Sequence, residues 1–325
     1  MVLASRGRLW RLAPAVLPIA LSACPQLLND DFHELSQDAS PPGAAEVPDA
    51  GVDASSSSGD AGGGTSTLPE PDAGNAGKTP LSDVQLALRA ALVHRYRFDP
   101  GATLLDSVGA ANAVSVGATF SGGAAVLAGT GSGQYIDLPN GLLSGLRNAS
   151  FEVWVIWDVD DPTESTSSWQ RIYDLGRNPT SVEGQQCELD ADATALYLTP
   201  RTSGTSAGTL QLKCETCGET RLEAPSLPVG VQVQLSAVVD DDANQFSLYR
   251  DGVLVQSLPS SSSISLITNC SGRPAPCDWN NWLGRSQHIE DPPFQGRILD
   301  FRIYSAALSA SLIQASFVAG PDADW

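Results

Sequence analysis

Residues 294–304 have the sequence Phe-Gln-Gly-Arg-Ile-Leu-Asp-Phe-Arg-Ile-Tyr, and this stretch indicates the fold of the chain better than any other. Polar and apolar side chains alternate along it, so Leu299 and Phe301 fall on one face, and Ile298 and Asp300 on the other. This period of two is typical of a β-strand that buries one face. An aspartate in the middle of such a strand needs a charged or hydrogen-bonding partner.

Other short segments with strand-like composition precede this stretch, with turn residues between them. Asp251-Gly252 separates two of them and is the two-residue signal of a β-hairpin. Helical periodicity is almost absent, apart from a short helix expected over residues 81–91 and a final helix that Ser309 can cap. The pattern predicts an all-β antiparallel sandwich. The segments are 92–99, 124–127, 134–139, 151–157, 170–175, 195–198, 209–213, 231–239, 245–249 and 253–255.

The composition of the chain limits its partners. Its net charge is −19, with 18 Lys and Arg against 37 Asp and Glu, so it lacks the basic surface that binding to nucleic acid requires. A divalent cation, or a neutral or cationic polymer, suits this charge better. The three histidines leave little material for a histidine-based centre. His94 alternates with apolar residues in the first strand, and we expect it to be packed and hydrogen-bonded.

The start of the chain predicts export. Arginines precede an apolar segment, residues 12–21, which is shorter than the roughly 20 residues that a bilayer-spanning helix needs. Leu21-Ser-Ala-Cys24 then resembles a bacterial lipobox, which implies a lipoprotein signal peptide over residues 1–23 and lipidation of Cys24. An ordinary signal peptide with a chance cysteine is the alternative. Pro25 favours the outer membrane or the cell surface over the inner membrane.

Residues 24–80 are predicted to form a disordered acidic tether. They consist mainly of Ala, Gly, Ser, Pro and Asp, and such a segment buries too little apolar surface to offset its ordering entropy. Ten acidic residues lie between positions 30 and 80, against Lys78 alone. About fifty residues of this kind reach about 40 Å on average. Residues 81–325 would then form the folded domain.

The order of motifs in residues 90–320 resembles the bacterial laminin-G-like domains of the concanavalin A type. No single motif is decisive, but their order matches. This resemblance implies an antiparallel jelly-roll β-sandwich over residues 81–325. The motifs are Tyr96-Arg-Phe-Asp99, Asp106-Ser107, Phe151–Trp157, Tyr249-Arg-Asp-Gly252, Leu283-Gly-Arg-Ser286, and the 294–304 stretch with the Ser-Ala-Ala-Leu-Ser that follows it.

The same resemblance implies a calcium ion at the rim of the sandwich, where the turn after the first strand meets the last strand. The matching positions are Asp99, Asp106 and Asp300. Calcium takes six to eight oxygen ligands, which three carboxylates with backbone carbonyls and water can supply. Alternatively, the first two are turn residues, and Asp300 pairs with an arginine such as Arg97 or Arg302.

Residues 188–192, Glu-Leu-Asp-Ala-Asp, resemble the Glu-x-Asp-x-Glu strand of the laminarinase-type glycoside hydrolases. In that motif alternate carboxylates act as nucleophile and general acid. Here Asp192 replaces the last glutamate and is one methylene shorter, and the run lies in a polar stretch beside a cysteine. We therefore predict an acidic loop and no enzyme activity.

Tryptophans in polar, loop-like surroundings are candidates for ligand contact, because flat aromatic rings stack on sugar faces. Trp169 and Trp279 meet this description, and Trp279 is expected to be better exposed than Trp282. Trp282 precedes Leu283-Gly284, a buried strand in the resembled family, so packing is expected for it instead.

The export prediction makes disulfides the expected state of the cysteines, in preference to a four-cysteine zinc site. The short loop from Cys270 to Cys277 is most simply closed by its own disulfide. Cys187 can then pair with Cys214 or with Cys217, which leaves one thiol over.

Together these observations predict an exported, lipid-anchored protein with one laminin-G-like domain on a disordered stalk. Its expected role is non-catalytic binding of a polysaccharide or an extracellular protein at the cell surface. A structural envelope or adhesion protein without a small ligand is the alternative, and a jelly-roll glycoside hydrolase is less favoured.

Overall fold

The computed structural model describes residues 81–98, 104–129, 131–180, 182–188, 191–203, 208–273 and 275–325. The predicted signal peptide, the lipidated cysteine and the tether lie outside the described residues, as does Asp99. None of the helices in the described ranges has the length and apolar character that crossing a bilayer requires.

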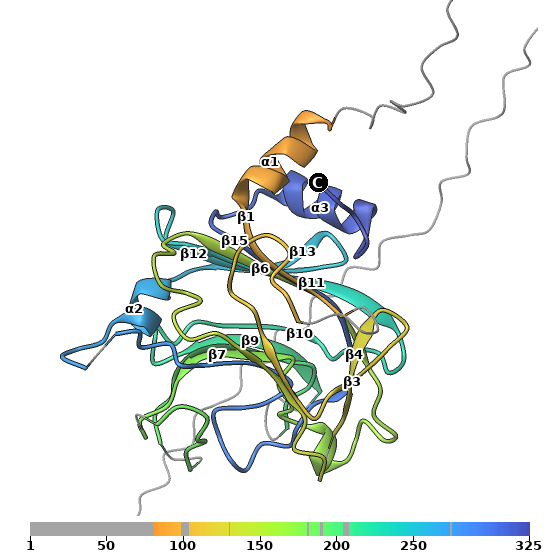
Figure 1. Cartoon of the computed structure of the whole chain (residues 1–325), viewed down its shortest axis with the longest axis vertical. Coiled ribbons are helices and arrows are strands. Elements are labelled where there is room, and N and C mark those ends of the chain that lie inside the picture. The colour runs from red at the N-terminus through yellow and green to blue at the C-terminus, as the bar shows by residue number, and fades with distance from the viewer. Residues whose placement is uncertain are drawn as a thin grey trace, which may run out of the picture. The chain divides into compact units, whose positions relative to one another are not determined.

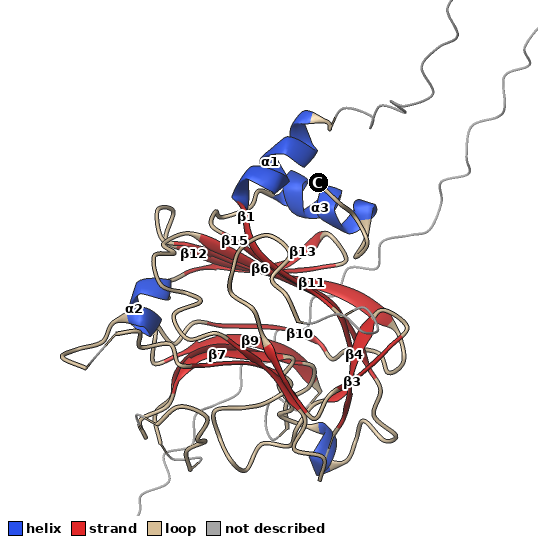
Figure 2. Ribbon diagram, in the orientation of Figure 1, coloured by secondary structure: helices blue, strands red, loops and turns tan. Residues whose placement is uncertain are grey.

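Two antiparallel sheets pack face to face and confirm the predicted sandwich (Figures 1 and 2). The eight-stranded sheet has the order β13 (Val253–Pro259), β12 (Gln245–Arg250), β11 (Gln232–Asp240), β6 (Ala149–Trp157), β15 (Gln295–Tyr304), β4 (Ala124–Ala128) and β3 (Thr119–Ser121), and β1 (Leu92–Arg97) also pairs with β15. The seven-stranded sheet has the order β10 (Arg221–Pro225), β9 (Thr209–Glu215), β8 (Thr194–Thr199), β7 (Tyr173–Arg177), β14 (Asn280–Leu283), β5 (Tyr135–Leu138) and β2 (Val114–Val116).

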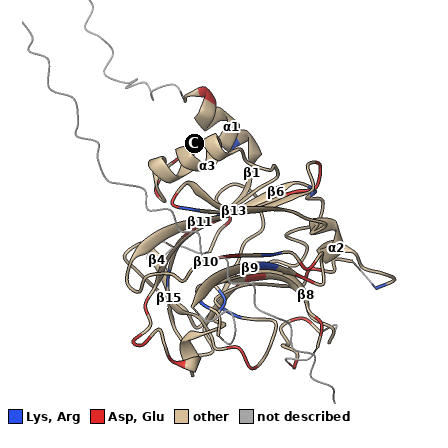
Figure 3. Ribbon diagram, turned by 180° about the vertical axis from the view of Figure 1, so that it is seen from behind, with Lys and Arg blue, Asp and Glu red and all other residues tan. Residues whose placement is uncertain are grey.

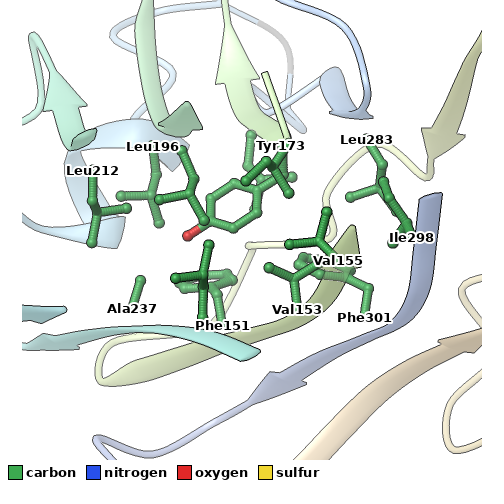
Figure 4. Close-up of a cluster of buried hydrophobic side chains, with 14 of the residues drawn as sticks. Phe151, Val153, Val155, Tyr173, Leu196, Leu212, Ala237, Leu283, Ile298 and Phe301 are labelled. Atoms are coloured by element: carbon green, nitrogen blue, oxygen red, sulfur yellow. The ribbon is translucent and has the colours of Figure 1, made fainter. Parts of the chain in front are cut away.

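The main core fills the space between the two sheets. β6 is buried along its whole length, as expected for a central strand. Figure 4 shows Phe151 and Val153 of β6 facing Tyr173 and Leu196 of the seven-stranded sheet. The inward faces of both sheets are therefore apolar, which leaves their outward faces for polar groups.

β15 contains a β-bulge that interrupts the predicted alternation of its side chains. Its register with β6 shifts between Ile298 and Asp300, so Leu299 is the extra residue. Ile298 and Phe301 consequently both point into the core, where each is completely buried (Figure 4). The expectation that Ile298 shares a face with Asp300 is wrong, because a bulge of one residue reverses the faces on one side of it.

The two halves of β15 pair with different strands on the same edge. Residues 295–298 pair with β4, and residues 300–304 pair with β1. Along its other edge β15 pairs with β6 throughout. The strand that best indicated the fold from sequence thus lies at the centre of the eight-stranded sheet.

Two helices cover the outer face of the eight-stranded sheet (Figure 2). α1 (Asp83–Ala91) begins with a capping box between Ser82 and Gln85, and Ser309 caps α3 (Ala310–Ala319), as predicted. A second apolar cluster, which includes Leu88, Tyr304 and Ile313, joins both helices to the sheet. Two shorter elements, η1 (Ser165–Ser167) and α2 (Ile264–Thr268), lie in the connections.

Candidate functional site

Asp106, a predicted calcium ligand, accepts hydrogen bonds from residues that lie close to it in the sequence. Its Oδ1 accepts hydrogen bonds from the amides of Arg95 and Val108 at 3.0 and 3.2 Å, and its Oδ2 lies 2.7 Å from Nδ1 of His94. Burial raises the pKa of Asp106, but the His94 bond and the backbone amides outweigh burial and lower it. The prediction that His94 is hydrogen-bonded is confirmed.

Asp300 lies in a sealed network of four charged side chains: Arg95, Glu152, Asp300 and Arg302. Arg95 Nη2 donates to Asp300 Oδ2 at 2.6 Å, and Arg302 Nε donates to Asp300 Oδ1 at 2.9 Å. Arg302 Nη1 also reaches Glu152 Oε1 at 2.9 Å. Burial raises the pKa of Glu152, although Arg302 opposes this effect. Asp300 thus has the arginine partners that a covered carboxylate needs.

These contacts do not fit a calcium ion shared by Asp106 and Asp300. All four of their carboxylate oxygens accept hydrogen bonds from protein donors. In the ranges that the structure describes, no three acidic, histidine or cysteine side chains gather into a metal-binding group. Asp99, the third predicted ligand, is outside those ranges.

The cysteine predictions are half confirmed. Cys270 and Cys277 form the expected disulfide. The pairing of Cys187 is wrong, because Cys214 and Cys217 are bonded to each other across the tight turn after β9, where their Cα atoms are 5.3 Å apart. That separation lies within the range a disulfide spans. Cys187 is free and buried, and burial raises the pKa of its thiol to about 11. Two disulfides indicate folding in an oxidising compartment.

The predicted tryptophans lie in different environments. Trp279 is only 9% exposed, so the expectation that it is an exposed candidate is wrong, although it is less buried than Trp282. The guanidinium of Arg273, from the Cys270–Cys277 loop, lies 6.0 Å from its ring. Trp282 is buried, as expected. Trp169 is half-buried and lines a groove.

This Trp169 groove lies on the outer face of the seven-stranded sheet and has a volume of about 670 Å³. The face is polar because Leu196, Leu198 and Leu212 point into the core, which turns their neighbours outward. Figure 3 shows acidic and basic residues together on β9. The walls of the groove include Ser168, Trp169, Arg171, Tyr197, Glu215 and His288.

Arg171 is the centre of the groove. Its Nη2 donates to Asp291 Oδ2 at 2.7 Å, and its Nε lies 3.4 Å from Asp174 Oδ2. The guanidinium also lies 4.1 Å from the ring centroid of Tyr197 and 5.8 Å from that of Trp169. Such cation–π contacts fix both the cation and the rings. Arg171 therefore holds the aromatic wall and the acidic wall of the groove in place.

His288 and Glu215 form a second charged pair in the groove, with Nε2 and Oε2 3.3 Å apart. Burial lowers the pKa of His288, but the hydrogen bond and charge of Glu215 raise it above the ordinary value. Burial raises the pKa of Glu215, but His288 and Lys213 bring it below the ordinary value. The pairing therefore favours the charged form of each group.

Asp174 lies beneath the groove, and its surroundings favour the protonated, uncharged form of its carboxyl group. It is 1% exposed, and burial raises its pKa to about 7 even though Arg171 opposes the shift. Its Oδ2 accepts the amide of Gln287 at 2.9 Å, and within the described ranges its Oδ1 has no hydrogen-bond partner. Together, Arg171, Asp174, Glu215, His288 and Asp291 are called the groove network below.

Trp169 is held in a backbone conformation that residues other than glycine seldom adopt, with φ at 62°. Its amide donates to the carbonyl of Arg201 at 2.8 Å, and its indole Nε1 donates to Ser203 Oγ at 2.7 Å. Such a conformation costs about 1–3 kcal/mol and is concentrated at functional sites. The two hydrogen bonds hold this strained residue, and with it the indole ring, in the groove wall.

The described residues of the hydrolase-like motif do not form the strand that the motif requires. Glu188 and Asp192 lie in a loop before β8, and positions 189–190 are outside the described residues. His288 Nδ1 lies 3.4 Å from the carbonyl oxygen of Glu188, so this part of the loop lies beside the groove.

The chain's sequence matches one protein family. The concanavalin A-like lectin/glucanases superfamily matches residues 130–314, which is more than half of the chain and includes the whole Trp169 groove. The chain belongs to this superfamily. No curated protein matches this concanavalin A-like chain.

Several solved structures resemble this concanavalin A-like domain. Domain 4 of AbnA, a GH43 extracellular arabinanase from Geobacillus stearothermophilus, in complex with arabinotriose, is 21% identical with a TM-score of 0.47, over 69% of this chain and 97% of that one. Trypanosoma rangeli sialidase in complex with sialic acid is 13% identical with a TM-score of 0.48, over 71% of this chain and 33% of that one. The Ruminococcus gnavus IT-sialidase CBM40 bound to α2,3 sialyllactose is 17% identical with a TM-score of 0.42, over 64% of this chain and 98% of that one.

Sequence reasoning missed most of the groove. Arg171, Tyr197, Glu215, His288 and Asp291 were not identified, because sheet pairing brings them together from distant parts of the chain. A signal for two of them was present, since Tyr197 and Glu215 are polar positions that alternate with core leucines and cysteine.

Proposed function

We propose that the Trp169 groove binds a carbohydrate without hydrolysing it. The observation that carries this proposal is the aromatic and polar wall formed by Trp169, Arg171 and Tyr197 in a groove of about 670 Å³. Sites for small ligands have volumes of about 300–1,000 Å³ and combine aromatic surface with a few placed polar groups. Membership of a superfamily of lectins and glucanases supports the same ligand class.

The charges of the groove favour a neutral ligand. Arg171 is paired with Asp291, and His288 is paired with Glu215, so both cations are balanced. Charged groups that are already paired still offer hydrogen bonds to hydroxyls, which a sugar has in abundance. The face of an aromatic ring is apolar and matches the C–H face of a pyranose or furanose ring.

The protonation states of the groove support binding without hydrolysis. A glycosidase needs a protonated carboxyl group that reaches the glycosidic oxygen and a second carboxylate opposite it. Glu215 has a lowered pKa and is tied to His288, so it is a poor proton donor. Asp174 has the raised pKa of a general acid, but it lies beneath Arg171 and is 1% exposed.

The proposal is tested by isothermal titration of residues 81–325 with linear cello-, xylo-, manno- and arabino-oligosaccharides. We expect at least one series to bind, and Trp169→Ala to weaken binding by about tenfold or more because the stacking surface is removed. Trp325→Ala is the matched control. This tryptophan lies against the cluster under α1 and α3 on the other sheet, so its removal should leave the affinity unchanged.

Two results would contradict the proposal. Absence of binding in all four series would favour the adhesion role without a small ligand. Release of reducing ends that Asp174→Asn or Glu188→Gln abolishes would show that the domain is a hydrolase.

We also propose that Cys24 anchors the protein to the bacterial envelope, through the lipobox and the acidic tether that follows it. Several acyl chains, each CH₂ contributing about 0.8 kcal/mol, would hold it stably on a membrane. Metabolic labelling with a palmitate analogue should mark the wild type and not Cys24→Ala. Equal labelling of both would remove this proposal.

A further inference from the structure

We infer that the ligand is a linear oligosaccharide that continues from the Trp169 groove into a second groove on the same face of the domain. The inference rests on the proposed carbohydrate function and adds the minimum size of the ligand. It assigns a second subsite, called the Arg285 groove, with a volume of about 380 Å³. Its walls include Gln134, Tyr135, Gln186, Arg285, Ser286 and Ile289.

The Arg285 groove repeats the chemistry of the first. The guanidinium of Arg285 lies 4.5 Å from the ring centroid of Tyr135 and 4.3 Å from that of Trp282. In the Trp169 groove, Arg171 lies against two aromatic rings in the same way. Each groove thus contains an arginine that packs on aromatic rings.

Arg285 retains donors for a ligand. A guanidinium has five N–H donors, and in the described part of the chain its one side-chain hydrogen bond runs from Nη2 to Gln186 Oε1 at 3.3 Å. Its neighbour Asp137 has a pKa raised by burial, which Arg285 partly offsets. A polar, uncharged hydroxyl is a suitable acceptor for these donors.

Asp291 joins the two grooves, since it lines both of them. Its Oδ2 accepts a hydrogen bond from Arg171 Nη2 at 2.7 Å on one side and from Ser286 Oγ at 2.6 Å on the other. These bonds fix the carboxylate at the boundary. A sugar residue that crosses from one groove to the other must pass this acceptor.

The order of the strands gives the distance between the far ends of the two grooves. Glu215 of the first groove is on β9, and Tyr135 of the second is on β5, with β8, β7 and β14 between them. Neighbouring strands lie about 4.8 Å apart, so the two ends are separated by about 19 Å across the sheet. A disaccharide would fill one groove, whereas a chain of about four sugar residues would contact both.

The test measures affinity against chain length for the cello-, xylo-, manno- and arabino-oligosaccharides from one to six residues. In the wild type, the tetrasaccharide of the series that binds should bind at least about tenfold more tightly than the disaccharide. Arg285→Ala should remove this gain and leave the disaccharide affinity unchanged. Arg147→Ala, a substitution of the same type at a site that is 72% exposed and outside both grooves, should preserve the gain.

A second variant distinguishes loss of the subsite from loss of folding. If thermal unfolding shows that Arg285→Ala is destabilised, Ile289→Trp narrows the groove from its rim, at a position 57% exposed, and should also remove the gain. Equal affinity for disaccharide and tetrasaccharide in the wild type would overturn the inference and leave the proposed function standing. Absence of binding in every series would overturn both.

Discussion

The two outer faces of the sandwich carry similar charged networks that differ in what lies beside them. On the eight-stranded sheet, α3 and the chain end enclose the sealed network, whose four side chains are each at most 5% exposed. On the seven-stranded sheet, the side chains of the groove network are at most 20% exposed, but the network borders an open groove of about 670 Å³. In both networks an arginine lies between two carboxylates.

The comparison shows that the surroundings of a charge cluster determine what it can do. The arginine donors of the sealed network are used by protein carboxylates and by the carbonyls of the C-terminal segment. Such a network can contribute only to folding. The groove network holds aromatic rings at the edge of solvent, so a ligand can reach its remaining polar groups. Four predictions test this difference.

Loss of Arg302 should have the largest effect. Arg302→Ala leaves Glu152 and Asp300 buried without their main cation, and breaking a buried pair in this way costs about 3–5 kcal/mol. The free energy of unfolding is measured by urea denaturation. Arg297→Ala is the control, because its pair with Asp158 is 42% and 33% exposed and should contribute less than about 1 kcal/mol. Equal losses in the two variants would mean that the sealed network is not structural.

Loss of Arg171 should destabilise the fold less and abolish ligand binding. We expect Arg171→Ala to cost about 1–3 kcal/mol, because water in the groove can solvate Asp291 and because Asp174 can take up a proton. The same urea titration measures this cost, and the oligosaccharide titration measures binding. A variant that kept full affinity would show that the groove network is not part of the site.

The groove network should also make stability depend on pH. The pKa of Asp174 is raised to about 7, and that of His288 is raised above its ordinary value. Both groups then bind more protons in the folded than in the unfolded state near neutral pH. Stability should therefore fall as the pH rises from about 5 to 8, by at most about 1.4 kcal/mol per pH unit for each proton. The lowered pKa of Glu215 has the opposite effect, because its contribution to stability is lost as the pH falls below the ordinary pKa of a glutamate.

Asp174→Asn should flatten this slope in thermal unfolding curves recorded from pH 5 to 8. Glu152→Gln is the matched variant in the sealed network, where burial also raises the pKa of the carboxyl. If only the Glu152 variant flattened the slope, the pH dependence would belong to the sealed network and the comparison would be reversed.

Calcium should have the smallest effect. The oxygens of Asp106 and Asp300 already accept protein hydrogen bonds, so we expect the same unfolding midpoint with calcium and with excess chelator. A metal at 100 times its dissociation constant would add about 2.7 kcal/mol and raise the midpoint by a few degrees. Such a rise, abolished by Asp300→Asn, would restore the predicted rim site.

The fold was predictable from sequence because its signals are local. The apolar run of β6, the Asp251-Gly252 turn and the cap at Ser309 each depend on a few neighbouring residues, and the structure has them all. The bulge at Leu299 was not predictable, since it appears only when β15 is set against β6. The state of Cys187 was not predictable for the same reason, because the turn after β9 brings Cys214 and Cys217 together and leaves Cys187 free.

The groove was less predictable than the fold. Trp169 was recognised from its polar surroundings, but nothing in the local sequence connects it with His288, which lies more than a hundred residues later. Trp279 was misjudged for a related reason, because its burial depends on tertiary packing that its local sequence does not show. Residues whose role depends on sheet pairing or on loop closure need the structure.

The position of α1 has a practical consequence. This helix begins the described part of the domain, and Trp325 packs beside it, both over the eight-stranded sheet (Figure 1). Both grooves are lined by residues of the opposite sheet and its connections. A fusion partner, a biotin tag or a sensor chip joined at residue 81 or at residue 325 would therefore lie on the side opposite the proposed binding face. Immobilised in this way, the domain would present its grooves to a polymer too large to diffuse around it.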